Sequence, residues 1–262
     1  MQYVLSINLS ISATHTGLVH RWLYEVAGIL HRDLSMKNIM YRIVKGKIHG
    51  VLMDYDLSSW TKKLTSDYAK TSQQRTGTPP FMAYELLDPN IDMLHLYRHD
   101  LESLFYIMLI LATQYEVQAP GESGEGCVGM REELPYRRWF NQQSYGDLSS
   151  FKYHFLTELE PLDLSPTFVE FRSWLVCLRA AFRVGLRSRV IHREKNNPEA
   201  QMPQDHQDEV SEDGVSPFDD ETLGGHVCYS AIIDPVANFK GTLKDLEVRY
   251  KGATASATQT TA

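Results

Sequence analysis

An eight-residue polar segment, His31 to Asn38, lies between a helical pattern and two strand patterns, and this arrangement most constrains the fold. Apolar residues recur at helical spacing over 18–30. Residues 39–44 and 48–53 each favour a short strand, and the Lys45-Gly46-Lys47 between them suits a tight hairpin. The sequence therefore predicts a polar loop between a helix and a β-hairpin.

The rest of the chain predicts a mainly helical domain. A pattern from about Arg98 to Thr113 is apolar nearly all round, which is typical of a helix in the middle of a helical lobe. A long polar loop is expected over 58–77 and a Gly-rich loop over 120–130. Further helical patterns cover 131–142, 148–159 and 167–187. The expected fold class is mainly α with a small β-hairpin.

Acidic charge is concentrated in one stretch. Residues 196–222 hold nine acidic residues, no Lys or Arg and few apolar side chains, which predicts a disordered segment. The remaining chain carries 26 basic and 24 acidic residues, and so nearly neutral a body argues against a nucleic-acid partner. A short helical segment is expected within 226–250 and a disordered tail over 251–262.

Cysteine and apolar content predict an intracellular protein, in the cytoplasm or nucleus. Cys127, Cys177 and Cys228 form no CxxC pair, so separate reduced thiols are expected. No apolar run approaches the roughly 18 residues that span a bilayer, and the first residues lack the basic region of a signal peptide. We expect no membrane partner.

The strongest motif is His31-Arg32-Asp33-Leu34-Ser35-Met36-Lys37-Asn38. It matches every fixed position of H-R-D-L-x-x-x-N, the catalytic-loop pattern of protein kinases. In that family the Asp accepts the hydroxyl proton of the attacking substrate, and the Asn binds magnesium. The resemblance implies that Asp33 is a catalytic base and Asn38 a magnesium ligand, with His31 and Arg32 in structural roles.

Three further motifs follow in the order that this resemblance implies. Asp54-Tyr55-Asp56 resembles D-F-G, so Asp54 would bind magnesium. The segment 77–85, GTPPFMAYE, resembles the end of an activation segment, with Tyr84 in place of the usual Pro. Its Thr78 is typical of Ser/Thr kinases, where the hydroxyl approaches the catalytic Asp. Asp100 matches the Asp that begins a central helix and holds the catalytic loop by hydrogen bonds.

Together the motifs resemble the protein kinase superfamily, and the runs HRWLYEVAGILHRDLSMKNIMYR, GTPPFMA and YRHDLESLFY are most similar to its fungal-type family. The resemblance implies a kinase-like C-terminal lobe over 1–190. Its catalytic loop would be 31–38, its metal motif 54–56 and its activation segment 54–85, with Glu85 as a structural residue. The implied cofactors are ATP and Mg²⁺, and the implied partner is a protein substrate.

Two features depart from the family's pattern. Ser35 occupies the place of the phosphate-contacting Lys of Ser/Thr kinases, so Lys37 is the expected contact to the γ-phosphate. Upstream of His31 there is no Lys and no G-x-G-x-x-G, and the one acid, Glu25, lies in the expected helix. We therefore expect the N-terminal β-rich lobe to be missing, and weak ATP binding by these residues alone.

Three functions remain open, and whether the chain alone is an enzyme is undecided. The first is a truncated Ser/Thr protein kinase lobe, inactive by itself. The second is a pseudokinase-like module that binds a partner, or another copy, through an exposed interlobe face. The third is a small-molecule phosphotransferase of the aminoglycoside or choline kinase type, which lacks the G-T-P-P-F-M-A-x-E segment.

Two finer expectations concern regulation and structure. A phosphorylated side chain in the loop, among Thr65, Ser66, Thr71, Ser72 and Thr76, would lie near Arg32. Arg179, Arg183 and Arg187 share one helix face, expected to be mainly solvated, and one of them is a candidate partner for Glu85.

Overall fold

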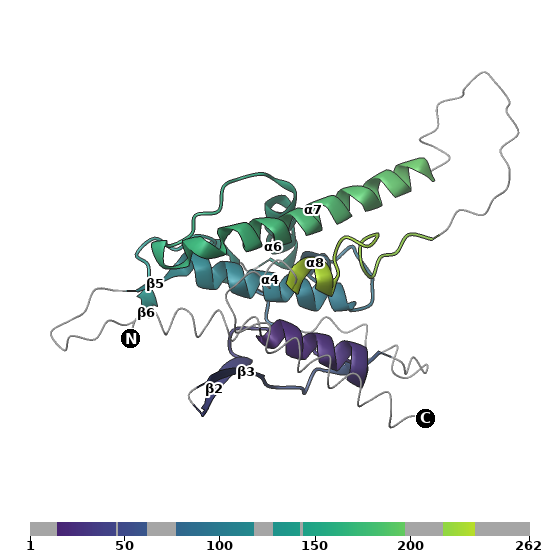
Figure 1. Cartoon of the computed structure of the whole chain (residues 1–262). Coiled ribbons are helices and arrows are strands. Elements are labelled where there is room, and N and C mark those ends of the chain that lie inside the picture. The colour runs from purple at the N-terminus through teal and green to yellow at the C-terminus, as the bar shows by residue number, and fades with distance from the viewer. Residues whose placement is uncertain are drawn as a thin grey trace, which may run out of the picture.

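The computed structural model describes residues 15–45, 47–61, 77–117, 128–141, 144–196 and 217–233. In Figure 1, helix α4 (Tyr97–Gln114) runs through the middle of the molecule. Helix α7 (Arg172–Lys195) lies on one side of it and the N-terminal helix, residues 15–22, on the other. The described strands form three two-stranded sheets. The prediction of a mainly helical fold with few short strands is confirmed.

The N-terminal helix ends earlier than its apolar pattern predicted. It continues as a π-helical turn, η1 (Leu23–Ala27), and Gly28 then adopts φ 69° while its N–H bonds the carbonyl of Leu23. A left-handed residue that closes a helix favours glycine, which has no Cβ to clash. Ile29 and Leu30 therefore leave the helix and form β1 (Ile29–Leu30), which pairs antiparallel with β4 (Ser59–Trp60).

The predicted hairpin is present, and it sets the ends of two motifs beside each other. Strand β2 (Ile39–Val44) pairs antiparallel with β3 (Lys47–Leu52) in a register that places Ile39 opposite Leu52. One further hydrogen bond, from Met53 N–H to the carbonyl of Asn38, extends this pairing at 2.9 Å. Asn38 and the residue before Asp54 are thus fixed side by side.

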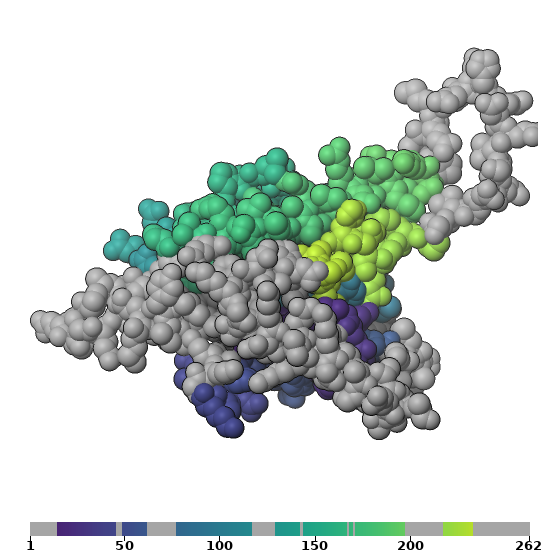
Figure 2. Space-filling model, viewed as in Figure 1, coloured from purple at the N-terminus to yellow at the C-terminus, as the bar shows by residue number. Residues whose placement is uncertain are grey.

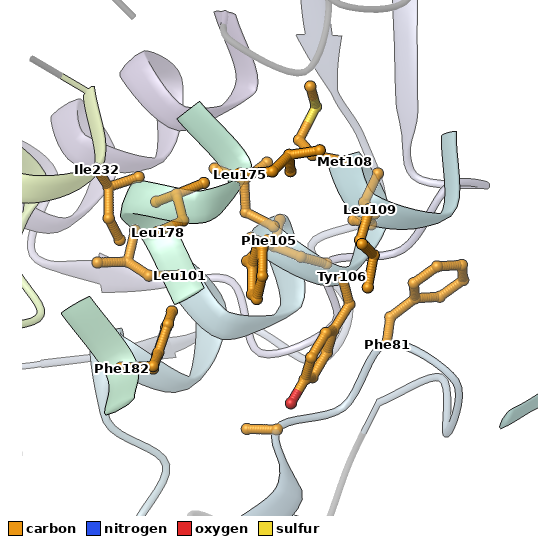
Figure 3. Packing of buried hydrophobic residues seen from close by; sticks show 14 of the residues in the cluster. Phe81, Leu101, Phe105, Tyr106, Met108, Leu109, Leu175, Leu178, Phe182 and Ile232 are labelled. Carbon is orange, nitrogen blue, oxygen red and sulfur yellow. The ribbon is translucent and has the colours of Figure 1, made fainter. Parts of the chain in front are cut away.

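Helix α4 is buried along its whole length, as its apolar pattern predicted. Figure 3 shows Phe105 packed between α4 and α7, near Leu175 and Leu178. The Phe105 ring stacks on that of Phe182 with centroids 6.0 Å apart. Each fully buried side chain of this size contributes roughly 1.5–3 kcal/mol to the stability of the fold. Helix α4 is therefore a stable framework for the polar loops.

The expected helix over 131–142 is mostly absent. Of the described residues 131–141, only α5 (Arg138–Asn141) is helical, and Pro135 lies within the preceding turns, where its ring and missing N–H oppose a helix. Residues Val128–Met130, expected in a loop, form β6 and pair with β5 (Tyr115–Val117). The part of the Gly-rich loop at 118–127 lies outside the described residues.

The last two predicted helices are present with shifted ends. Helix α6 (Tyr145–Thr157) begins three residues early because the Ser144 hydroxyl caps it by accepting a hydrogen bond from Asp147 N–H at 3.3 Å. The other begins as a 3₁₀ turn, η2 (Pro166–Phe171), and α7 then continues eight residues past its predicted end. Among the described residues no helix is both long and apolar enough to cross a membrane.

Residues 217–222, included in the expected disordered segment, instead fold against the helices. Figure 2 shows the segment 217–233 lying against α7. Leu223 is fully buried, and the indole N–H of Trp174 donates to the carbonyl of Ile232 in α8 (Tyr229–Ile233) at 2.8 Å. Apolar side chains at and just after the end of the acidic stretch pack on the core, namely Phe218, Leu223 and Val227. These side chains explain why residues 217–222 fold against the helices.

Three other expectations fall outside the described residues. They are the body of the acidic segment at 197–216, the helix and tail expected after 233, and most of the long polar loop, at 62–76.

Adding a methyl group at Gly185 tests the docking of segment 217–233. A Cβ there would lie 2.7 Å from the Cβ of Leu223 and 3.2 Å from its carbonyl oxygen. Alanine is the better helix former by about 1 kcal/mol, yet we expect Gly185→Ala to lower the Tm and expose 217–233 to limited proteolysis. Val184→Ala, on the exposed side of α7, is the control. Unchanged protection in Gly185→Ala would contradict the packing.

Candidate active site

Asp33 lies half-buried in its loop, and two segments contact its carboxylate. Its Oδ1 accepts hydrogen bonds from the backbone N–H and the hydroxyl of Thr78, both at 2.9 Å. The Asn38 side chain donates through Nδ2 to the carbonyl of Asp33 at 2.9 Å and to its Oδ2 at 3.2 Å. Three predicted site residues, from motifs about 40 residues apart, are thus brought together.

Two residues of the site have strained backbones. Arg32 has φ 70° and Asp54 has φ 63°, both in the left-handed region. Such a conformation costs a non-glycine residue of order 1–3 kcal/mol, and it persists only where surrounding contacts hold it. The Arg32 N–H donates to both oxygens of Asp100 at 3.2 Å. The contact with Asp100 on α4 therefore shapes the loop that carries Asp33.

Asp100 is fully buried at the start of α4 and receives hydrogen bonds from three segments. The His31 N–H donates to it at 3.1 Å, and the Nε2 atoms of His20 and His95 each lie 2.8 Å from it. Burial by itself would raise the pKa of Asp100, but His95 and His20 outweigh burial and hold that pKa well below its usual range. The carboxylate is therefore ionised and holds the backbone on either side of the loop's first peptide bond.

His20 extends this network to the C-terminal segment. Its Nε2 lies 2.8 Å from Oδ2 of Asp100. The Tyr229 hydroxyl lies 2.7 Å from Nδ1 of the same ring. Neither His20 nor Tyr229 was singled out from the sequence, because the pair is separated by 209 positions and no local pattern connects them.

His31 joins the loop 31–38 to the motif 54–56. Its Nδ1 accepts from the Asp33 N–H at 3.3 Å, so Nε2 carries the proton that is shared with the carbonyl of Met53 at 2.9 Å. The Tyr55 ring meets the imidazole edge-on with centroids 5.1 Å apart. Burial lowers the pKa of His31, although Asp100 acts in the opposite direction. The ring is thus a neutral bridge between the two motifs.

Asn38 and Asp54 together offer oxygen ligands of the kind that Mg²⁺ prefers. The Asn38 Nδ2 is engaged with Asp33, which leaves the amide oxygen as the atom available to a cation. Asp54 is exposed at the end of β3, beyond the Met53–Asn38 hydrogen bond. One amide oxygen and one carboxylate, completed by phosphates and water, suit a magnesium ion bound with a nucleotide. Lys37 is exposed at the edge of the same loop.

Glu85 is buried and paired with two arginines and a histidine. Arg189 Nη1 lies 2.5 Å from its Oε1, while Arg98 and His99 meet Oε2. Burial would raise the pKa of Glu85, but His99, Arg98 and Arg189 lower it overall. The candidates Arg179, Arg183 and Arg187 are not its partners. Arg189 lies beyond the predicted end of α7 at 187, so the sequence-based interpretation missed it.

Comparison with known proteins identifies the same region. Residues 17–112 match the model of the family described as fungal protein kinase. The activin receptor type-1B proteins of Homo sapiens and Rattus norvegicus are each 32% identical over 137 residues, which is 50% of this chain and 25% of the receptor. The chain thus spans about a quarter of the length of these curated relatives. The family match includes Asp33, Asn38, Asp54, Thr78 and Asp100.

His99 makes the stability of the fold depend on pH. Burial and the charge of Arg98 lower its pKa to about 3, whereas an unfolded histidine titrates near 6.5. Between these values the unfolded chain binds a proton that the folded chain does not. Stability therefore falls as the pH is lowered, by about 1.4 kcal/mol per unit from this group. Urea unfolding from pH 7 to 4 should show a shallower slope for His99→Gln than for the control His154→Gln, on the exposed side of α6; equal slopes would contradict this.

Removing the Tyr229 hydroxyl tests the link between the C-terminal segment and the loop. Tyr229→Phe leaves the buried Nδ1 of His20 without its hydrogen-bond partner, which costs roughly 1–3 kcal/mol. We expect a lower Tm and faster amide exchange at His31 and Arg32. Tyr153→Phe, whose ring is 42% exposed, is the matched control. A Tyr229→Phe protein as stable as the control would show that the contact contributes little.

Proposed function

We propose that this chain, whose residues 17–112 match the fungal protein kinase family, carries the catalytic lobe of a protein Ser/Thr kinase. The reaction would transfer the γ-phosphoryl group of ATP to a Ser or Thr hydroxyl of a protein. Asp33 would accept the proton of that hydroxyl as it attacks. The substrate protein is the proposed partner.

The contact between Thr78 and Asp33 is the observation that supports this proposal most. Both the hydroxyl and the N–H of Thr78 lie 2.9 Å from Oδ1, and Asn38 contacts Oδ2, so the carboxylate is oriented from two sides. A general base must lie within hydrogen-bond reach of the proton it takes, with a fixed orientation. The exposed side of the same half-buried carboxylate is where a substrate hydroxyl would be received.

The nucleotide would be bound by the loop and the end of the hairpin. Asn38 and Asp54 are the proposed Mg²⁺ ligands, and Lys37 would contact the γ-phosphate. ATP with Mg²⁺ supplies the transferable phosphoryl group and neutralises its charge. In kinases a Gly-rich loop, a Lys and a Glu of the N-terminal lobe also contribute to ATP binding, and none of the three is identified among residues 1–30. Losing one such donor costs roughly 3 kcal/mol, so we propose that activity requires a β-rich lobe in addition to these residues.

A second candidate function is a binding module that does not catalyse. Large apolar side chains on the β2–β3 hairpin are exposed, Met40 at 51%, Ile43 at 63% and Val44 at 42%. Exposed apolar patches of this kind commonly mark interaction sites. A stable complex or self-association that is unchanged by Asp33→Asn but lost in Ile43→Asp would favour this alternative.

The proposal is tested by nucleotide binding and by phosphorylation. Calorimetric titration of the chain with Mg-ATP should show weak binding that Asp54→Ala abolishes. Joining the chain to the N-terminal lobe of a fungal protein kinase should give phosphorylation of Ser/Thr peptides. In that chimera Asp33→Asn should lower kcat by about 10²- to 10⁴-fold, while Thr78→Ser keeps most activity and Thr78→Val does not. A folded chimera that binds Mg-ATP but transfers no phosphate would contradict the proposed kinase activity.

A further inference from the structure

Two fully buried ionisable residues lie behind the segment 78–84 and have no part in the function proposed above. Glu102 is on α4 and Lys152 is on α6, and both side chains are 0% exposed. Lys and Glu are almost never fully buried unless they are paired or hydrogen-bonded. What these two residues bind therefore indicates what they are for.

The Lys152 side chain binds the segment from behind. Its Nζ donates to the carbonyl of Pro79 at 3.1 Å and to that of Met82. It also lies 4.4 Å from the centroid of the Tyr106 ring and 5.5 Å from that of Trp139. Burial lowers the pKa of Lys152 well below its usual range. Two carbonyls three residues apart are thus held by one nitrogen, which fixes the bend between them.

Glu102 binds the end of the same segment. Its Oε1 accepts from the Tyr84 N–H at 2.7 Å and from the Tyr106 hydroxyl at 2.6 Å. No described residue hydrogen-bonds to its Oε2. Burial raises the pKa of Glu102 to about 7, even though both hydrogen bonds lower it. Burying a carboxylate with so few donors costs free energy. We therefore expect the hydrogen bond to Tyr84 to stabilise the end of the segment.

Tyr84 can donate that hydrogen bond because it has a backbone N–H. The kinase pattern that segment 77–85 resembles has a proline at this position. Tyr84 is the first residue of α3 (Tyr84–Leu87), and Ala83 before it has φ −58° and ψ 146°, the conformation that precedes proline most easily. A proline would fit this backbone but would have no N–H to give to Glu102. The Tyr84 N–H and the Glu102 carboxylate are therefore a donor–acceptor pair that a proline at position 84 would remove.

We propose that Glu102 and Lys152 are positioning residues that hold segment 78–84 in the conformation that receives the peptide around the phosphorylated Ser or Thr. This rests on the proposed function, which supplies both the peptide and its place beside Thr78 and Asp33. The segment begins at Thr78, which contacts Asp33, so the two anchors also set the position of Thr78 against the base. Both residues act through the segment and touch no reacting atom.

The pairing is tested first on the 262-residue chain, without any activity. Glu102→Leu is made in two backgrounds, Tyr84→Ala, which keeps the N–H, and Tyr84→Pro, which removes it. We expect Glu102→Leu to raise the unfolding equilibrium constant about tenfold more in the Tyr84→Ala background than in the Tyr84→Pro background. Equal effects in both backgrounds overturn the proposed pair.

Hydrogen exchange and peptide kinetics then separate positioning from general stability. Lys152→Met should speed exchange of the described amides in 78–84 at least tenfold and leave α7 unchanged, while the exposed control Arg187→Met changes neither. In the kinase chimera, Glu102→Leu and Lys152→Met should raise the peptide KM about tenfold with the ATP KM unchanged. A loss confined to kcat overturns the docking role. An inactive parent chimera counts against the proposed function, and the exchange and unfolding results then decide the positioning proposal by themselves.

Discussion

The buried carboxylate of Asp100 is the interaction on which the polar part of this protein depends. It receives the N–H groups of His31 and Arg32 and the rings of His20 and His95. Four donors on one ionised, fully buried carboxylate keep it charged and satisfy it. Because these hydrogen bonds hold the start of the loop, they fix both the strained φ of Arg32 and the orientation of Asp33.

Two other buried carboxylates also join distant segments. Glu85 is held by Arg98, Arg189 and His99, whereas Glu102 accepts through Oε1 from Tyr84 and Tyr106. Removing one partner of a buried ion pair such as that of Glu85 typically costs about 3–5 kcal/mol. Single substitutions at these contacts are therefore expected to destabilise the fold. The contacts also join α3 and segment 78–84 to the long helices.

The C-terminal segment 217–233 is part of this framework rather than an appendage to it. Its Tyr229 hydroxyl reaches His20, its Asp220 carbonyl accepts from Arg98 at 2.5 Å, and the hydroxyl of Tyr97 donates to the carbonyl of Val227 at 2.9 Å. Each contact joins it to the start of α4 or to the helix before the loop. The residues nearest Asp33 are thereby braced by residues close to the other end of the chain.

Much of the fold could be predicted from local patterns, because each pattern is complete within a few residues. The hairpin over 39–52 and the buried helix α4 follow from periodicity, and the order of the motifs placed Asp33, Asn38, Asp54 and Asp100. Where local signals were misinterpreted, a single residue decided the outcome. Gly28 ended the first helix, and Pro135 prevented most of another.

The tertiary structure alone decided which distant residues meet. Arg189 rather than Arg179, Arg183 or Arg187 pairs with Glu85, because α7 runs past its predicted end. The most distant hydrogen-bond partner lies 18 positions from Glu102, 80 from Asp100 and 73 from Lys152. Periodicity and propensity report only on neighbours within a turn or a strand pair. Burial against a remote segment leaves no such local mark, so these pairings emerged only once the chain was folded.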